Sequence, residues 1–251
     1  MVNKKWVRYS AVILGVALGV ALATNHIEPS LGTLLPIGVG VFSVYLATFI
    51  WFSINEQKNI IKILMIEGQP DLYLQKMSVL KRQVKGDKFR RLIEVNICAG
   101  LIYEGNIDEA VDKLEDLSIR GFSPMHKGVY YNNLAFGYLM QNRILDSQDI
   151  FKKHIGEMLA ADRDPMVQSC ARCTQAILDY KQRRISIAHE TLDRLLEKDL
   201  MPLQKAVALY YKGLILRDLG KQGSNQVFKE CSTKAGNTVF RKLSDVALES
   251  A

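Results

Sequence analysis

The fold of this chain is predicted by one stretch, Leu101-Ile-Tyr-Glu-Gly-Asn-Ile-Asp-Glu-Ala-Val-Asp-Lys-Leu114. It is typical of the end of one amphipathic helix and the start of another, joined at Gly105. Gly105 can adopt the left-handed conformation that ends a helix at no steric cost. Asp108 and Glu109 place negative charge in the first turn of the second helix, where the helix dipole favours it. One such hairpin cannot bury its own apolar face, so the fold depends on whether the hairpin recurs.

Comparable turns recur along the chain at intervals of 37, 37, 41 and 37 residues, a spacing typical of helical-repeat arrays. In the three middle units, a small residue follows five positions after each turn and a large apolar residue nine positions after it. The first and last units depart from this pattern, as the end units of an array do. The turns are centred on Gly68, Gly105, Asn142, Arg183 and Gly220; the small residues are Ala110, Ser147 and Ala188; and the apolar residues are Leu114, Phe151 and Leu192.

At this point the chain resembles the tetratricopeptide repeat (TPR) family. Residues 105–110, Gly-Asn-Ile-Asp-Glu-Ala, resemble the turn between the two helices of a repeat, and residues 133–138, Asn-Leu-Ala-Phe-Gly-Tyr, resemble its first helix. Pro202 lies where the family often ends a repeat, whereas Cys98 occupies a position that is usually small. The resemblance implies an all-α fold: a right-handed α-solenoid of about five TPR-like helix pairs and a C-terminal capping helix.

The helix boundaries follow from apolar periodicity and from start and stop signals. No alternating strand pattern stands out. We expect a loop at 121–127 and helices at 71–85, 88–103, 107–119, 128–141, 144–160, 165–181, 185–198, 203–219, 224–235 and 238–249.

Two apolar segments precede the repeats. Residues 11–23 hold no polar side chain, and residues 31–54 hold no charge across 24 positions. Because a span needs about 20 largely apolar residues, we expect a membrane anchor at 1–54 with transmembrane helices at about 6–25 and 31–54. A cytoplasmic repeat domain would follow at 55–251.

The distribution of Lys and Arg predicts the orientation. Lys4, Lys5 and Arg8 precede the first segment, Lys58 and Lys62 follow the second, and the loop between them has no Lys or Arg. The positive-inside rule therefore predicts a multi-pass protein of the cell (inner) membrane with both termini cytoplasmic. Two alternatives stay open: residues 1–23 can be read as a cleaved signal peptide, and the Gly-x-x-x-Gly pair in the first segment fits either packing between the spans or a homodimer.

The net charge of +7 lies entirely within the first 91 residues, which hold 12 basic and 5 acidic side chains. A basic cluster beside a membrane is attracted to anionic lipid, so the sequence predicts contact with the lipid bilayer, with a solvated helix face as the alternative. No nucleic acid partner is expected, because no recognised binding motif accompanies the charge. The predicted basic patch consists of Lys76, Lys81, Arg82, Lys85, Lys88, Arg90 and Arg91.

Few residues indicate chemistry. Cys170 and Cys173 form a Cys-x-x-Cys pair, but a zinc site needs four ligands, and the other two cysteines stand singly in helical patterns. Neither a phosphate-binding loop nor a nucleophile elbow occurs in the sequence. We therefore expect no enzyme, no cofactor and no metal; a membrane-bound metal or redox protein using Cys170 and Cys173 is the alternative, and a structural subunit of a larger membrane complex is another.

The remaining candidate site is the groove that the first helix of each repeat lines in the resembled family. Its positions here are more apolar and aromatic than polar, which suits a helical or apolar peptide segment. The sequence thus predicts a membrane-anchored, non-catalytic adaptor or scaffold for a cytosolic or membrane protein partner, unless these side chains form core or are covered by residues 238–249. The predicted groove consists of Asn132, Asn133, Phe136, Met140, Ile177, Tyr180, Tyr210, Leu214 and Arg217.

Overall fold

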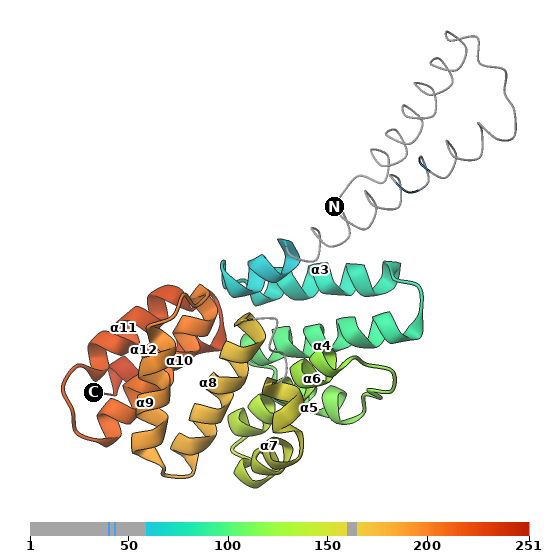
Figure 1. Cartoon of the computed structure of the whole chain (residues 1–251). Coiled ribbons are helices and arrows are strands. Elements are labelled where there is room, and N and C mark those ends of the chain that lie inside the picture. Colours follow the sequence, from blue (N-terminus) through green and yellow to red (C-terminus); the bar gives the residue numbers. More distant parts are fainter. Residues whose placement is uncertain (1–39, 41–42, 44–58, 160–164, 251) are drawn as a thin grey trace, which may run out of the picture. The chain divides into compact units, whose positions relative to one another are not determined.

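The computed structural model describes residues 40, 43, 59–159 and 165–250. The chain divides into two compact units, Met1–Ile61 and Lys62–Ala251. The helices α3 to α12 belong to the second unit, which Figure 1 shows as a series of antiparallel hairpins. Their bounds are α3 Pro70–Gln83, α4 Asp87–Glu104, α5 Ile107–Glu115, α6 Pro124–Met140, α7 Ile144–Leu159, α8 Pro165–Lys181, α9 Ile185–Leu196, α10 Pro202–Asp218, α11 Ser224–Lys234 and α12 Val239–Glu249.

The five predicted turns all have left-handed backbone. The φ angle is +61° at Gly68, +109° at Gly105 and +62° at Gly220, and it is also positive at the two non-glycine positions, +61° at Asn142 and +63° at Arg183. The predicted turn register is therefore confirmed from the first repeat to the last.

A shared hydrogen-bond pattern explains why these helices end where they do. At four of the five turns, the amide that follows the left-handed residue donates to a carbonyl five positions back, as in a Schellman motif. After Gly68, the amide of Gln69 instead donates to Ile63 O, six positions back. The distances are 2.9 Å for Asn106 to Leu101, 2.8 Å for Arg143 to Tyr138, 2.8 Å for Arg184 to Asp179 and 2.9 Å for Lys221 to Leu216.

The repeated small and apolar positions form the core. The small residues Ala110, Ser147 and Ala188 have no exposed surface, and neither do Leu114 and Leu192. Small side chains here let the two helices of a hairpin approach closely, and the large ones fill the space between hairpins. The predicted helical-repeat core is thus confirmed in the middle of the array.

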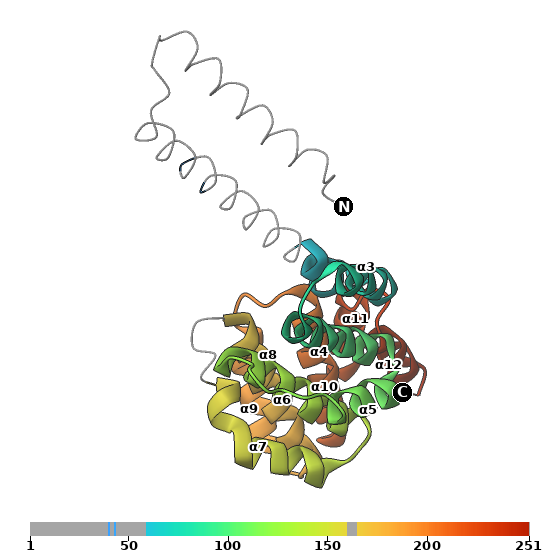
Figure 2. The same ribbon diagram turned by 90° about the vertical axis from the view of Figure 1, so that its right-hand side faces the viewer.

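The last helix returns to the first repeats. Each helix of the set α4, α6, α8 and α10 packs on the next, α10 packs on α12, and α12 packs back on α4 (Figures 1 and 2). The turn before α12 also meets the turn before α3, because the amide of Asn237 donates to Gly68 O at 2.7 Å. We call the side of α4, α6, α8 and α10 that faces α12 the inner face.

Two predicted boundaries are wrong by four residues. Helix α6 begins at Pro124 rather than at 128, because Ser123 acts as its N-cap and accepts a hydrogen bond from the amide of His126. Proline at the first helical position completes this start signal. Helix α5 ends at Glu115 rather than at 119.

The membrane part of the predicted fold class is contradicted. Within the part of the chain that the structure describes, no helix is long and apolar enough to cross a bilayer. The segments expected to span, about 6–25 and 31–54, lie outside the described residues apart from Gly40 and Ser43, as do the domain boundary at 54, the cleavage site at 23 and the Gly-x-x-x-Gly pair. We therefore correct the fold class to an all-helical repeat array, and we withdraw the assignment as a multi-pass membrane protein.

Candidate functional site

The centre of the inner face is filled by aromatic rings. Phe240 of α12 lies against three helices: its ring centroid is 6.2 Å from Tyr103 of α4, 6.2 Å from Phe136 of α6 and 5.6 Å from Tyr210 of α10. Tyr211 of α10 joins them at 6.4 Å. We call these five residues the aromatic cluster. Because Phe240 has no exposed surface, the cluster is packed like a protein core rather than open like a groove.

Three of the predicted groove residues are buried. Phe136 belongs to the aromatic cluster, and Ile177 of α8 is fully buried. Asn132 is also buried, and its side-chain oxygen accepts a hydrogen bond of 2.9 Å from the Thr174 hydroxyl. These residues join neighbouring inner helices to one another.

The other predicted groove residues remain at least partly exposed. Asn133 donates from its side-chain nitrogen to Val95 O at 3.3 Å, and Tyr210 lies at the edge of the aromatic cluster. Near the C-terminal ends of α6, α8 and α10 stand four residues that we call the inner rim. They are Met140, Tyr180, Leu214 and Arg217.

Contacts between helices hold three residues of the inner rim in place: Met140, Tyr180 and Arg217. The Tyr211 hydroxyl donates to the sulfur of Met140 at 3.5 Å, and the Tyr180 hydroxyl donates to an Asp218 carboxylate oxygen at 2.9 Å. Burial, and then the Asp218 carboxylate, raise the pKa of Tyr180 to about 12. Tyr180 therefore stays a neutral hydrogen-bond donor near neutral pH. Arg217 donates to Ala247 O of α12 at 3.4 Å.

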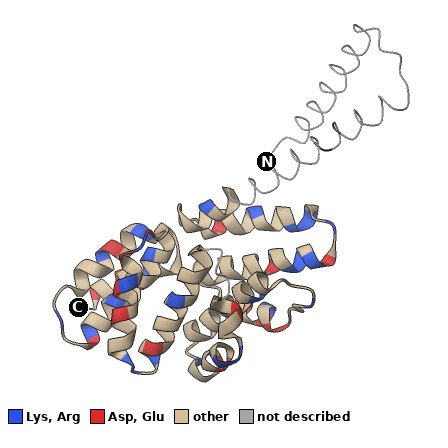
Figure 3. Cartoon of the chain, viewed as in Figure 1, with Lys and Arg blue, Asp and Glu red and all other residues tan. Residues whose placement is uncertain are grey.

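The predicted basic patch lies on α3, α4 and the turn between them, where Figure 3 shows blue segments at the end of α3 and the start of α4. Among the described residues, ion pairs involve two of its members: Lys81 pairs with Glu94, and Arg91 pairs with Asp87 at 3.0 Å. Lys81, Arg90 and Arg91 line one charged hollow of about 390 Å³, to which carboxylates also contribute. The remaining members, Lys76, Arg82, Lys85 and Lys88, are exposed.

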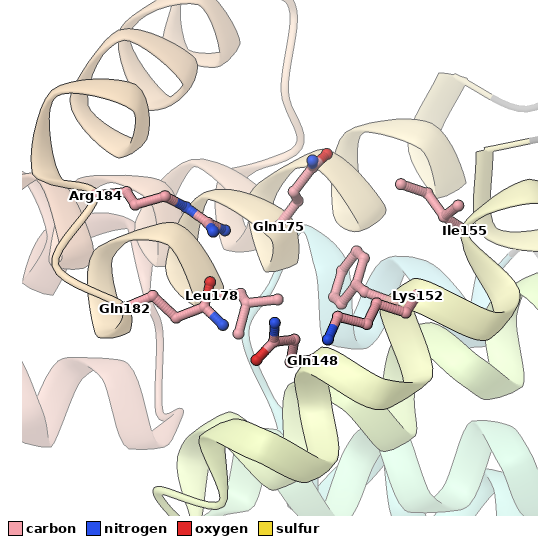
Figure 4. A pocket seen from close by; sticks show the side chains of 8 residues that line it. Gln148, Lys152, Ile155, Gln175, Leu178, Gln182 and Arg184 are labelled. Atoms are coloured by element: carbon pink, nitrogen blue, oxygen red, sulfur yellow. The ribbon is translucent and has the colours of Figure 1, made fainter.

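A groove between α7 and α8 was not predicted from the sequence. Its volume is about 250 Å³, and Phe151, Ile155 and Leu178 supply its apolar surface. Figure 4 shows polar side chains around it, from α7, from α8 and from the turn that follows α8. The polar lining residues are Gln148, Lys152, Gln175, Gln182 and Arg184. In the sequence, Phe151 stands at the apolar repeat position nine residues after the turn at Asn142, and nothing in the repeat pattern singles out the other residues of this groove.

The cysteine pair offers little support for metal or redox chemistry. Cys173 is buried, and burial raises its pKa well above the ordinary value, which disfavours the thiolate that metal binding and redox exchange need. The sulfur of Cys170 accepts a hydrogen bond from Gln204 at 3.2 Å. In the described ranges, no group of three or more His, Cys, Asp or Glu side chains is placed to hold a metal ion.

These features define a class of protein: an all-helical repeat array whose inner face is closed by its last helix. No protein-family model matches the chain, and no curated protein matches it in sequence. The TPR resemblance therefore stands only at the coarser level of a helical repeat fold.

Among solved structures, the chain is similar to PlcR from Bacillus thuringiensis. The structure of PlcR in complex with the peptide PapR7 and DNA matches with a TM-score of 0.58 and 15% identity, over 90% of this chain and 85% of PlcR. PlcR in its apo form matches with a TM-score of 0.56 and 13% identity, over 89% of this chain and 87% of PlcR. At this identity the likeness shows a shared helical fold.

Proposed function

We propose that residues 55–251 form a non-catalytic helical-repeat domain that binds a peptide segment of a protein partner. The observation that carries this proposal is the inner rim, where apolar and aromatic side chains stay partly exposed beside the packed aromatic cluster. Met140 and Leu214 offer apolar surface, the Tyr180 ring adds aromatic surface while its hydroxyl is held by Asp218, and Arg217 offers hydrogen-bond donors. A surface of this kind suits an amphipathic peptide, whose apolar side chains enter between the helices while its polar side is held at the edge.

The fold comparison supports the same reading. PlcR, which shares the helical fold, was solved with a bound peptide. That structure also holds DNA, so the expectation that nucleic acid is not a partner of this chain has no support from the comparison. The inner rim, being apolar and aromatic, fits a peptide better than a phosphate backbone, whose affinity comes chiefly from Lys and Arg.

Crosslinking of the full chain in its native cells tests the proposal. A photo-crosslinking residue placed beside the inner rim should capture a protein, and that capture should be lost with Leu214→Glu, because a carboxylate there is unfavourable against an apolar peptide surface. Leu145→Glu is the matched control, since Leu145 is 76% exposed on α7.

The control variant should keep the captured protein. If the folded Leu214→Glu chain retains every partner, or if both variants lose the same one, the inner rim is not the binding surface. Circular dichroism of both variants confirms that each comparison is made between folded chains.

A further inference from the structure

Helix α12 presents one fully packed stripe to the rest of the array. Phe240, Ser244 and Ala247 lie at positions i, i+4 and i+7, and all three are buried. Val246, on another face of the same helix, is 62% exposed. This is the pattern by which an amphipathic helix docks into a groove of a binding protein.

The surface that receives this stripe consists of the inner face together with α11, on which α12 also packs. Phe240 stacks on Phe136 with an angle of 14° between the ring planes, and its ring also contacts Tyr210 of α10. Arg217 of the inner rim reaches the backbone of the same helix at Ala247. Helix α12 therefore lies where a bound partner helix would be expected to lie.

One buried side chain of α12, Ser244, lacks a good hydrogen-bond partner. Ser244 has no exposed surface, and its hydroxyl has no partner at hydrogen-bonding geometry among the described residues. The thiol of Cys231 lies near it, but it already donates to Ala206 O at 3.1 Å, and sulfur is a weak acceptor. A buried hydroxyl without a good partner weakens the packing around it.

The short length of α12 also limits how stably it packs on the rest of the array. The helix has 11 residues, and an isolated helix of this length is only marginally stable in water. Once detached, α12 would lose much of its helical structure. A partner that is already helical therefore competes on favourable terms, because it does not have to order a chain in order to bind.

We propose that α12 is a displaceable occupant of the inner face, and that the partner is a helix with the same stripe. This helix carries an aromatic residue followed four and seven positions later by small residues. The inference rests on the proposed function and names the chemistry of its partner. In the partner helix, alanine at the position that corresponds to Ser244 would bind more tightly than serine. A bulky side chain there would be excluded, because the space around Ser244 is fully packed.

Fluorescent peptides covering residues 237–250 provide the probe, and binding to the full chain is measured by anisotropy. A peptide with the Ser244→Ala change should bind the wild-type chain measurably, and a peptide with Phe240→Ala should show no saturable binding. The chain variant Phe240→Ala, whose own α12 is weakened, should bind the first peptide at least about tenfold tighter than the wild type does.

A second chain variant, Ser244→Ala, should weaken peptide binding, whereas Phe240→Ala should strengthen it. Ser244→Ala in the full chain removes the poorly partnered hydroxyl, so its own α12 should hold more firmly and the peptide should bind about fivefold more weakly than to the wild type. This comparison stands even if the Phe240→Ala chain fails to fold. Equal affinity of the wild-type and Ser244→Ala chains, or no binding to any folded chain, would overturn the inference.

The two proposals fail in different ways. If the peptide series behaves as expected but the native partner is captured equally by the Leu214→Glu chain, α12 is displaceable and the proposed partner site is wrong. If the partner depends on Leu214 while the peptides do not bind, the inner rim is the site and α12 is a fixed part of the fold.

Discussion

At the scale of single residues, burial controls the chemistry of the cysteines. Cys98 has no exposed surface. Burial, with a smaller contribution from the nearby Glu94 carboxylate, raises the pKa of its thiol to about 12. In an unfolded chain a cysteine thiol has a pKa of about 8.5. The protonated thiol is therefore favoured by the folded state.

This difference predicts a loss of stability at alkaline pH. Below pH 8.5 the contribution of Cys98 is fully present; above it the unfolded chain releases a proton that the folded chain retains until about pH 12. Cys98 should thus lower the free energy of unfolding by up to about 1.4 kcal/mol for each pH unit in this window. Urea unfolding of the wild type and Cys98→Ala between pH 8.5 and 10 checks this. The variant should show the shallower pH dependence, and parallel curves would contradict the prediction.

Asp179 departs from the repeat pattern, although the turn at Arg183 that follows it lies where the pattern predicts. Asp179 stands where the other repeats carry Tyr138, Leu101 or Leu216, and from sequence alone it is a lapse. In the structure its buried carboxylate accepts a hydrogen bond of 2.9 Å from Arg184 Nε, the first residue after the turn at Arg183. Sequence spacing predicts the turn, but it does not tell which polar residue will find a partner across it.

At the scale of helices and hairpins, local signals predicted most of the fold. The turn register predicted the helix order and most helix boundaries to within two or three residues. These boundaries are predictable because a left-handed residue, a proline at a helix start or a small packing residue determines the structure of only the few residues around it. The end of α5 and the start of α6 are the exceptions. At α6, residues 121–127 lack apolar periodicity, and the Ser123-Pro124 start signal was overlooked. The groove between α7 and α8 depends on how two hairpins pack, which no single stretch encodes.

A pair of glycines tests the packing within the α6–α7 hairpin. A Cβ added at Gly128 of α6 would overlap Glu157 O in the backbone of α7, whereas one added at Gly156 of α7 would meet no atom within 4 Å. Gly128→Ala should therefore lower the free energy of unfolding by about 1–3 kcal/mol through overpacking. Gly156→Ala should raise it by about 0.5–1 kcal/mol, because alanine is the better helix former. Denaturant titration of both variants decides: equal effects would mean that the two helices are not in backbone contact at Gly128.

At the scale of the whole repeat unit, the contact between its two ends is what the sequence did not reveal. The predicted capping helix at 238–249 matches α12 to within one residue, but Phe240 reaches residues more than 100 positions away, and a periodic pattern carries no information about such pairings. For the same reason the predicted groove residues divided into buried and exposed sets. Their helical faces were predictable from the repeat register. Covering by residues 238–249 was one of the alternatives that the sequence left open, and the sequence did not decide which of these side chains would be covered.

The contact between the ends predicts that α3 and α12 are coupled in stability. Gly236 has a φ of +60°, and a Cβ there would lie 2.6 Å from Gly68 O, so Gly236→Ala combines backbone strain with a clash between the two ends. Gly223 is the matched control, because its φ is +97° but a Cβ there would meet no atom within 4 Å. Both variants should pay a strain of roughly 1–2 kcal/mol for a left-handed non-glycine residue.

Hydrogen exchange should then speed up at the start of α3 and in α12 together for Gly236→Ala, and only around the start of α11 for Gly223→Ala. If Gly236→Ala loosens α12 and leaves the start of α3 as protected as in the wild type, the ends touch without stabilising each other, and release of α12 by a partner would not be transmitted to the first repeat.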